Sequence, residues 1–370
     1  MAYSILLDPP AADWDQFVTT HRDAHLLQTA DWGHLKAGFG YTAQRVALQD
    51  GSRIIGGALI LFRRMPMGIG TRAYIPAGPL LPDDDPAHPA NAALWEGIHT
   101  TARQHGAIFL KAEPCNWYRP RPDLPAPLER AGLRLSSLTE QPPRTIVLDI
   151  SGDEETILKR MNQSTRRKVN MKTKKDIEVR IGTRADVDSF TRLMAITSQR
   201  DAFGAYEPEY YQRAFDLFAV GERCALLIAS YQGRDLAGLF AFRCGENAYY
   251  LYGASSNEER NRMPTYILQL EAIRWAKRHG AIRYDLWGIP DEDEATLEAQ
   301  FEQRQEGLWG VYKFKRGFGG QVIRSVGAWD KVYNPLVYQA YTWAINSRKQ
   351  RHRTEEVAAS ETPTEPLEET

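Results

Sequence analysis

Two lysines near the end of the chain have the chemistry needed for acyl transfer. The segment Gly310 to Gly320, GVYKFKRGFGG, places Lys313 and Lys315 two residues apart. Its alternating pattern predicts a strand with both lysines on one face. A lysine held beside an acyl carbonyl would stabilise the oxyanion that forms when an amine attacks. The same pattern is typical of an edge strand protected by lysine, so both interpretations stay open.

Two other positions carry side chains suited to substrate contact. Lys36 follows Trp32 by four residues, so both side chains share one face of a predicted helix. Glu113 ends an apolar stretch, where its carboxylate is either part of a turn or a group that positions or deprotonates an attacking amine. A set of tyrosines either belongs to the core or presents hydroxyls to a ligand: Tyr206, Tyr210, Tyr211, Tyr249, Tyr250 and Tyr252.

The densest basic segment is Lys159 to Lys175, KRMNQSTRRKVNMKTKK. Apolar or small residues recur every four positions and predict a single amphipathic helix with a cationic outer face. The inner face would be formed by Ile157, Met161, Thr165 and Val169. The outer face, with Arg166, Arg167 and Lys168, is either a solvated surface or a contact surface for a phosphate backbone.

The composition restricts the kinds of partner. The 370 residues carry 46 Lys and Arg against 47 Asp and Glu, a formal net charge of -1, so a nucleic acid would have to bind a local patch, and DNA is not expected. The three cysteines lack metal-ligand spacing, and no metal site is predicted. The first residues do not resemble a signal peptide, and the longest apolar run, Ile54 to Phe62, is too short to span a bilayer. We therefore expect a cytoplasmic protein.

One pattern occurs twice along the chain. Arg45 to Phe62 and Leu226 to Phe242 each predict two apolar strands joined by a polar turn. The sequence HGAI occurs at His105 and again at His279, each time between a predicted helix and a predicted strand. This repeated order resembles the core of GNAT-like acyltransferases. It predicts an α/β fold of two tandem GNAT-like modules, with mixed sheets flanked by helices.

The two prolines after Gln141 predict a hinge between the modules. The first module would comprise residues 1–144 and would be completed by a C-terminal helix at about residues 323–347. The second module would comprise residues 145–322. Residues 348–370 show no apolar periodicity, so we expect a disordered tail.

Six segments, taken in order, resemble the FemABX family of peptidoglycan-bridge aminoacyltransferases over nearly the whole chain except the tail. The segments are LLQTADWGHLKAGFG from Leu26, YIPAGPLL from Tyr74, IFLKAEP from Ile108, SQRDAFGAYEPEYY from Ser198, YLYGASS from Tyr250 and YKFKRGFGG from Tyr312. The resemblance implies transfer of an amino acid from aminoacyl-tRNA, as co-substrate and without a cofactor. The acceptor would be an amine of a peptidoglycan precursor peptide, UDP-linked or lipid-linked. A peripheral contact with the inner membrane face is compatible with that role.

The resemblance also implies roles for individual residues. Lys36 would contact the diphosphate of the precursor, Tyr210 and Tyr252 would contact the rest of it, and Lys315 would act at the reacting carbonyl. The family often has a basic residue in place of Tyr206 and Asp in place of Glu113. Tyr206 and Lys313 are further candidate substrate contacts, and the arginines and lysine at positions 166–168 are candidate tRNA contacts.

Two other functions are compatible with such a fold. The first is an acyl-CoA-dependent N-acyltransferase acting on a small metabolite or a lipid precursor. The segment Asn257 to Met263, where acyl-CoA users carry a glycine-rich pyrophosphate loop, contains no glycine, and this favours a different acyl donor. The second is a non-catalytic binding protein that keeps the fold, because function depends on the site.

Overall fold

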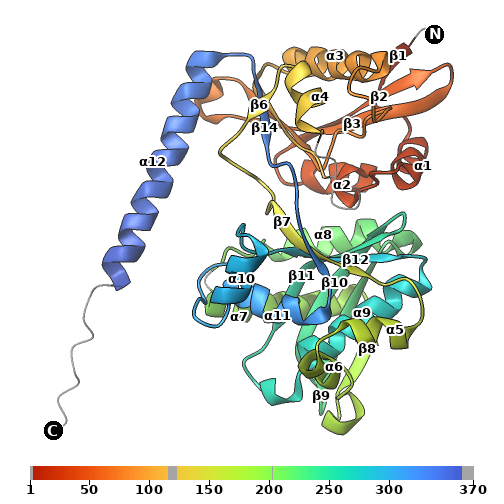
Figure 1. Cartoon of the computed structure of the whole chain (residues 1–370), viewed down its shortest axis with the longest axis vertical. Coiled ribbons are helices and arrows are strands. Elements are labelled where there is room, and N and C mark those ends of the chain that lie inside the picture. Colours follow the sequence, from red (N-terminus) through yellow and green to blue (C-terminus); the bar gives the residue numbers. More distant parts are fainter. Residues whose placement is uncertain (1–2, 116–122, 202, 361–370) are drawn as a thin grey trace.

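The computed structural model describes residues 3–115, 123–201 and 203–360. The chain forms two modules, each built on a seven-stranded mixed sheet with helices packed on its faces (Figure 1). The prediction of an α/β fold with two mixed sheets flanked by helices is confirmed.

The first sheet has the order β1-β2-β3-β4-β5-β14-β6, in which β4 and β5 are parallel and the other neighbours antiparallel. Its strands are β1 (Tyr3–Leu7), β2 (Thr42–Asp50), β3 (Arg53–Arg64), β4 (Thr71–Pro76), β5 (Ala107–Glu113), β14 (Trp329–Val332) and β6 (Arg134–Leu135). Its helices are α1 (Ala11–Thr20), α2 (Ala30–Ala37), α3 (Pro89–Gln104) and α4 (Pro125–Arg130).

The second sheet has the order β8-β9-β10-β11-β12-β7-β13, in which β11 and β12 are parallel. Its strands are β8 (Glu178–Ile181), β9 (Cys224–Tyr231), β10 (Arg234–Cys244), β11 (Asn247–Ser255), β12 (Arg283–Gly288), β7 (Arg144–Asp149) and β13 (Gln321–Arg324). The helices after residue 150 are α5 (Glu154–Arg160), α6 (Gln163–Val169), α7 (Val187–Asp201), α8 (Pro208–Phe218), α9 (Pro264–Arg278), α10 (Glu294–Gln300), α11 (Trp309–Lys315) and α12 (Pro335–Ser360). Of these, α12 follows the return of the chain to the first module.

The two sheets have the same strand pattern, position for position. The paired strands β2 and β3 correspond to β9 and β10, and the parallel pair β4 and β5 corresponds to β11 and β12. In each module a helix, α3 or α9, precedes the second parallel strand and ends before a glycine with positive φ: Gly106 at +63° and Gly280 at +83°. Both predicted hairpins and both HGAI transitions are therefore present.

The chain passes between the modules twice. After the linker, β7 enters the second sheet beside β12, and after β13 the chain returns to place β14 beside β5 of the first sheet. The modules also share one apolar core cluster, which contains Trp14 and Leu26 of the first module together with Phe190 and Tyr210 of the second. The interface between the modules is therefore packed as a protein interior.

Helix α12 extends to Ser360, and residues 361–370 lie outside the described part of the chain. The disordered tail expected at residues 348–370 stays a prediction. The segment is rich in Arg, Lys, Gln, Glu and Ala, which are strong helix formers even without an apolar stripe. No helix in the described ranges combines the length and apolarity that crossing a bilayer requires.

The basic segment is not one helix. The chain is extended at Met161, and Asn162 caps a new helix, α6, by accepting a hydrogen bond from Thr165 N at 2.8 Å. Asn is a strong helix-initiating residue, and this local preference interrupts the four-residue periodicity. The predicted inner face is nevertheless buried in both helices.

The predicted strand at Gly310 to Gly320 is wrong: Trp309–Lys315 is a helix, α11. Its buried residues, Trp309, Tyr312 and Lys315, recur every three positions, which is a helical spacing, and Lys313 lies exposed on another face. The lysine alternation thus reflects one buried and one solvated position of a helix.

Candidate functional site

The structure surrounds Lys36 with aromatic rings from both modules. Its Nζ lies 4.8 Å from the ring centroid of Trp32 on the same helix, 5.3 Å from that of Tyr206 and 4.9 Å from that of Tyr210. The Nζ also donates a hydrogen bond to Tyr210 Oη at 2.9 Å. We call these four residues, together with Tyr252, the Lys36 cage.

Helix α8, the segment before it and strand β11 supply the second-module side of the Lys36 cage. The rings of Tyr206 and Tyr210 stack at 3.9 Å, and Tyr210 Oη lies 3.2 Å from Tyr252 Oη on β11. Tyr210 is buried, whereas Tyr206 is 50% exposed, so the cage opens to solvent on the Tyr206 side. Burial lowers the pKa of Lys36 to about 8 and raises the pKa of Tyr210.

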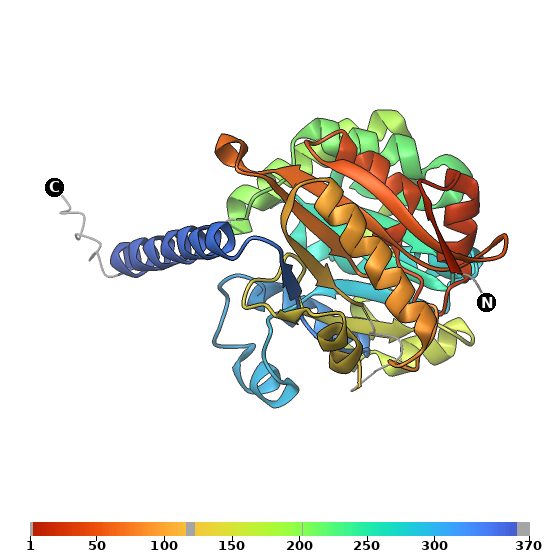
Figure 2. The same cartoon turned by 90° about the horizontal axis from the view of Figure 1, so that it is seen from above.

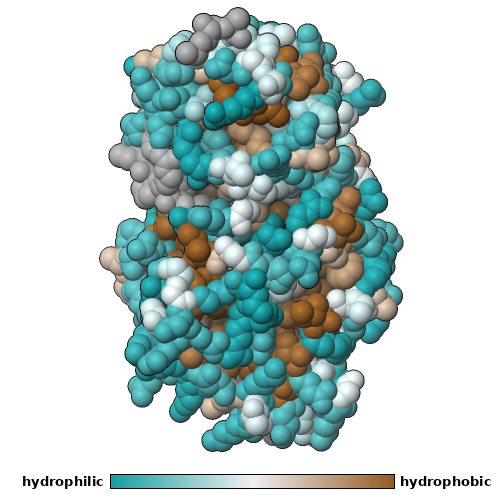
Figure 3. Space-filling view, turned by 90° about the vertical axis from the view of Figure 1, so that its right-hand side faces the viewer, coloured by the Kyte–Doolittle hydropathy of each residue, from teal (hydrophilic) through white to brown (hydrophobic). Residues whose placement is uncertain are grey.

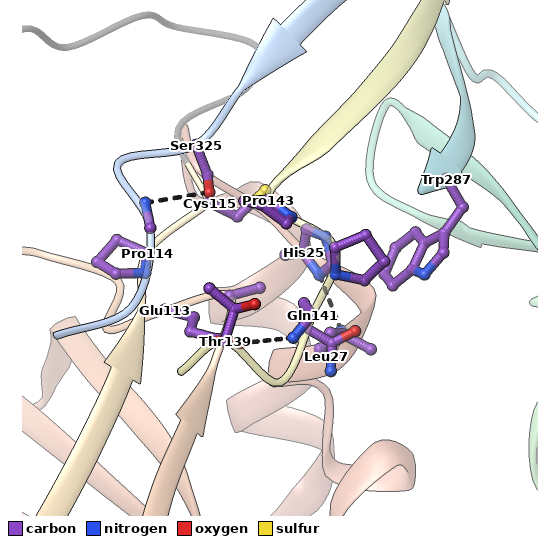
Figure 4. A pocket seen from close by; sticks show the side chains of 13 residues that line it. His25, Leu27, Glu113, Pro114, Cys115, Thr139, Gln141, Pro143, Trp287 and Ser325 are labelled. Carbon is purple, nitrogen blue, oxygen red and sulfur yellow. Dashed lines mark hydrogen bonds between the residues drawn. The ribbon is translucent and has the colours of Figure 1, made fainter. Parts of the chain in front are cut away.

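A second site, the inter-module pocket, lies where β5 and β12 end (Figure 4). The indole of Trp287, at the end of β12, faces the imidazole of His25 with ring centroids 6.0 Å apart. The pocket is lined by His25, Leu27, Ala77, Glu113, Pro114, Cys115, Thr139, Gln141, Pro142, Pro143, Trp287, Ser325 and Gly327. It therefore combines both modules, the linker and the returning chain.

Glu113 is held firmly in the wall of this pocket. Its carboxylate accepts hydrogen bonds from Tyr74 Oη at 2.6 Å, from Glu140 N at 2.5 Å and from Gln141 N at 3.1 Å. Burial raises the pKa of Glu113, and the hydrogen bonds from these donors oppose that shift. The carboxylate thus attaches the linker to the end of β5.

Lys315 lies behind the opposite wall. Its side chain is buried, with 4% exposure, and its Nζ donates to the backbone oxygens of Trp287 at 3.1 Å and Gly288 at 2.8 Å. The Nζ also lies 5.8 Å from the ring centroid of Tyr250 on β11. Burial lowers the pKa of Lys315 to about 7, and the carboxylate of Asp285 opposes the shift.

The position of Lys315 follows from a divergence of two strands. The parallel pairing of β11 and β12 runs from Asn247↔Arg283 only as far as Tyr249↔Asp285. Beyond that pair β11 continues along β10, while β12 pairs with β7 through a bulge at Trp287, whose φ is +64°. The ammonium of Lys315 lies between the separated strand ends.

Asp285 holds the bulge in place. Its buried Oδ1 accepts from Trp287 N at 2.7 Å and from Thr145 Oγ1 at 2.5 Å. Gly288 allows the linker to approach, because a Cβ there would lie 2.6 Å from Pro142. The sequence analysis missed Asp285 and Trp287, which occur singly in an apolar stretch and show no recognisable spacing.

His25 was also missed. Its Nδ1 accepts from Leu27 N at 3.1 Å, so the proton of the neutral ring lies on Nε2, and burial lowers the pKa of His25 to about 3. A neutral imidazole in this pocket provides a hydrogen-bond donor without adding charge. No motif in the sequence marks this histidine.

The other predicted contacts lie elsewhere. Lys313 is exposed on α11, on a different face from Lys315. On α6, Arg167 is exposed, Arg166 is half-buried, and Lys168 places its Nζ 4.6 Å from the ring centroid of Tyr266 on α9. The structure therefore brings Lys36, Tyr206, Tyr210 and Tyr252 into one cluster. It places Glu113 in the wall of the inter-module pocket and Lys315 behind Trp287, which also lines that pocket.

The fold and this interface define an architecture of two α/β modules that share one strand pattern. The sequence pattern of the FemAB family matches residues 10–235 and 227–346, so the chain belongs to the FemAB family. The resemblance drawn from the sequence is confirmed.

Named relatives agree with this assignment. A lipid II:glycine glycyltransferase of Staphylococcus saprophyticus is 24% identical, and one of Staphylococcus haemolyticus is 26% identical; each alignment covers 88% of this chain and 92% of the relative. The predicted transferase class agrees with these names.

Solved structures agree on the fold. The crystal structure of FemX superposes with a TM-score of 0.82 at 22% identity, covering 92% of this chain and 99% of that one. A tandem GNAT protein from the clavulanic acid biosynthesis pathway gives a TM-score of 0.52 at 14% identity, covering 90% and 99%. The prediction of two GNAT-like modules is thereby confirmed.

Proposed function

We propose that this protein is a cytoplasmic aminoacyltransferase that moves an amino acid from aminoacyl-tRNA to an amine of a peptidoglycan precursor peptide. The observation that carries the proposal is the Lys36 cage, in which a half-buried ammonium from α2 donates to a tyrosine hydroxyl of α8, which in turn lies within hydrogen-bond distance of a tyrosine hydroxyl of β11. Such a site suits a diphosphate, which Lys36 meets as a cation, while the tyrosines supply hydrogen bonds and ring surfaces. The relatives are named lipid II:glycine glycyltransferases, and these names support a peptidoglycan precursor as the acceptor.

In the proposed reaction the acceptor amine attacks the ester carbonyl of the aminoacyl-tRNA. A bond forms between the amine nitrogen and the carbonyl carbon, the amine loses a proton, and the tRNA hydroxyl leaves with a proton. Lys315 Nζ uses two of its three N–H groups on the backbone oxygens of Trp287 and Gly288, and the third donates to the oxyanion. The hydrogen-bonded bulge at Trp287 fixes the direction of that donor.

Glu113 is assigned to the acceptor amine. A carboxylate has about four accepting positions, and three are occupied by Tyr74 Oη and the two linker N–H groups. The remaining position accepts a hydrogen bond from the amine and orients it towards the ester. Arg166, Arg167 and Lys168 contact the tRNA backbone, and the exposed Lys313 supplies a further cation for the substrates.

The test is a transfer assay with purified protein, a set of charged tRNAs, and UDP-linked and lipid-linked precursors, followed by mass measurement of the precursor. We expect the precursor to gain the mass of one aminoacyl residue. A parallel reaction with acyl-CoA in place of charged tRNA is the control. Transfer from acyl-CoA alone would establish the acyl-CoA-dependent alternative, and binding of the precursor without any turnover would establish a binding protein.

A further inference from the structure

Helix α12 has one face fixed on the first module. Tyr338 Oη donates to the buried Asp330 Oδ2 at 2.7 Å, and the ring centroid of Phe109 lies 5.2 Å from those of both Tyr338 and Tyr341. These contacts hold the beginning of the helix beside the first sheet. The rest of the helix extends away from the body of the protein in two perpendicular views (Figures 1 and 2).

The outer face of α12 is uncharged and open to solvent, and it carries two large apolar side chains beside the exposed Gln339 and Asn346. Leu336 is 80% exposed and Trp343 is 72% exposed, and they are the two most exposed large apolar side chains in the described ranges. Leu336, Ala340 and Trp343 follow the four- and three-residue spacing of a single helix face. No charged residue occurs from Val332 to Ser347. This face is therefore suited to an apolar environment rather than to water.

A basic run follows directly along the same helix. Four Lys or Arg residues occur within six positions, in a chain whose net charge is -1; they are Arg348, Lys349, Arg351 and Arg353. A tryptophan with a cluster of Lys and Arg close by in the sequence is typical of segments that contact an anionic bilayer surface. Glu355 and Glu356 follow the basic run.

A neighbouring hairpin carries exposed basic and apolar residues. The tip between β3 and β4 carries the exposed Arg63 and Arg64 together with Ile69, which is 43% exposed. Met65 of the same tip packs in one cluster with Tyr338 of α12, so the hairpin lies beside the beginning of the helix. On the side of the molecule opposite α12, the surface is mainly hydrophilic, with apolar groups scattered among polar ones (Figure 3).

We propose that the outer face of α12, together with the β3–β4 hairpin tip, docks the protein on an anionic lipid bilayer. Leu336 and Trp343 enter the headgroup boundary, and the basic residues contact anionic headgroups. The combination of exposed aromatic and apolar residues with clustered positive charge favours an anionic membrane, and a second copy of this chain is the alternative that the test below distinguishes. This docking goes beyond the proposed transfer reaction, since it does not depend on which acceptor is used.

Vesicle flotation of the full chain tests the proposal. We expect binding to vesicles of phosphatidylcholine with phosphatidylglycerol, little binding to phosphatidylcholine alone, and weaker binding at high salt. The double variant Leu336→Ser with Trp343→Ser should weaken binding about tenfold or more. The matched control is Val220→Ser, which removes a 69% exposed side chain from the second module and should leave binding unchanged. Replacing the four basic residues by Gln should weaken binding about fivefold for each charge removed.

Several results would overturn the docking proposal. They are failure of the wild-type protein to bind anionic vesicles, and equal binding by wild type and the Leu336→Ser/Trp343→Ser variant. Sedimentation velocity gives an independent measurement: a dimer that this variant abolishes would assign the face to a second copy. Loss of tRNA binding with unchanged vesicle binding in the Gln variant would assign the basic run to RNA. Melting temperatures of all variants near that of the wild type show that folding is intact. Vesicle binding without any transfer activity would leave the docking intact and count against the proposed function alone.

Discussion

The two modules have the same strand order but differ at one corresponding point. In the first module, β4 and β5 stay paired to their ends, at Pro76↔Glu113. In the second module, β11 and β12 separate after Tyr249↔Asp285, where β12 forms a bulge in its pairing with β7. We call this end of the first sheet the closed end, because its two parallel strands stay paired. We call the corresponding end of the second sheet the open end, because its two parallel strands separate.

Different side chains occupy the corresponding positions. At the closed end of β5, Glu113 binds two backbone N–H groups of the linker and so attaches the linker to the first module. At the open end of β12, Lys315 places an ammonium between the separated strands. The two modules thus keep the same strand order and differ in local pairing and in the side chains placed beside it. In the proposed function, the second module supplies the acyl-transfer residue Lys315 and the first supplies binding groups, among them Lys36.

The largest expected effect comes from the open end. Lys315→Met should lower the single-turnover transfer rate by about 10²–10³, because the oxyanion loses its donor. It should also lower the free energy of unfolding by about 1–3 kcal/mol, since the backbone oxygens of Trp287 and Gly288 lose their partner. Rapid-quench kinetics and thermal melting measure the two effects.

Lys277 provides a matched control for this variant. Its Nζ also donates to two backbone oxygens of the second module, those of Ile150 and Gly152. Lys277→Met should therefore reduce stability without reducing the transfer rate. Equal losses of rate in the two variants would show that the effect of Lys315 is structural.

The sequence predicted features that depend on local pattern. The two hairpins and the HGAI transitions were found because periodicity and turn glycines are short-range signals. The helical state of α11 was missed because Lys315 is a buried lysine, and burial depends on packing against β12 from elsewhere in the chain.

The site was predicted in part only. The resemblance named Lys36 and Tyr210, but no local pattern indicates that α2 and α8 meet across the module interface. The roles of Asp285 and His25 arise from a bulge and from a buried ring, and neither leaves a pattern in the sequence. Residues that act through long-range contacts therefore need the fold before they can be recognised.

A second variant tests the binding role of the first module. Lys36→Gln should weaken precursor binding about 10–100-fold, because a charge-assisted hydrogen bond to the diphosphate is lost. Lys168→Gln, which also removes a cation lying over a tyrosine ring, should leave precursor affinity unchanged. Calorimetry at several salt concentrations measures both. A loss at Lys36 that does not depend on salt would assign this lysine to packing.

The pH dependence of precursor affinity is a further test of the binding role of Lys36. The pKa of Lys36 is lowered to about 8, so the ammonium loses its proton as the pH rises through that value. Precursor affinity should fall above about pH 8 in the wild type and stay nearly flat in Lys36→Gln. A fall of equal size in both proteins would place the titrating group elsewhere.

A substitution at the closed end of β5 should have a smaller effect on the transfer rate. Glu113→Gln should lower the transfer rate about tenfold if Glu113 orients the amine, because an amide oxygen accepts more weakly than a carboxylate. It should also destabilise the protein, since an amide N–H₂ would face one of the three donors. A loss of more than about 10³ in rate would instead make Glu113 the general base.

The smallest effect is expected from a substitution on α6, and it tests whether the two modules bind different substrates. Arg167→Glu should weaken binding of aminoacyl-tRNA about fivefold and make its salt dependence shallower, because a phosphate contact becomes a repulsion. Arg53→Glu changes an exposed arginine of the first module in the same way and serves as the control. Filter binding over a salt series measures both variants. If the tRNA binds to the second module alone, only Arg167→Glu weakens binding. Equal weakening by both variants would mean that the tRNA contacts both modules. The assignment of acyl transfer to one module and substrate binding to the other would then be wrong.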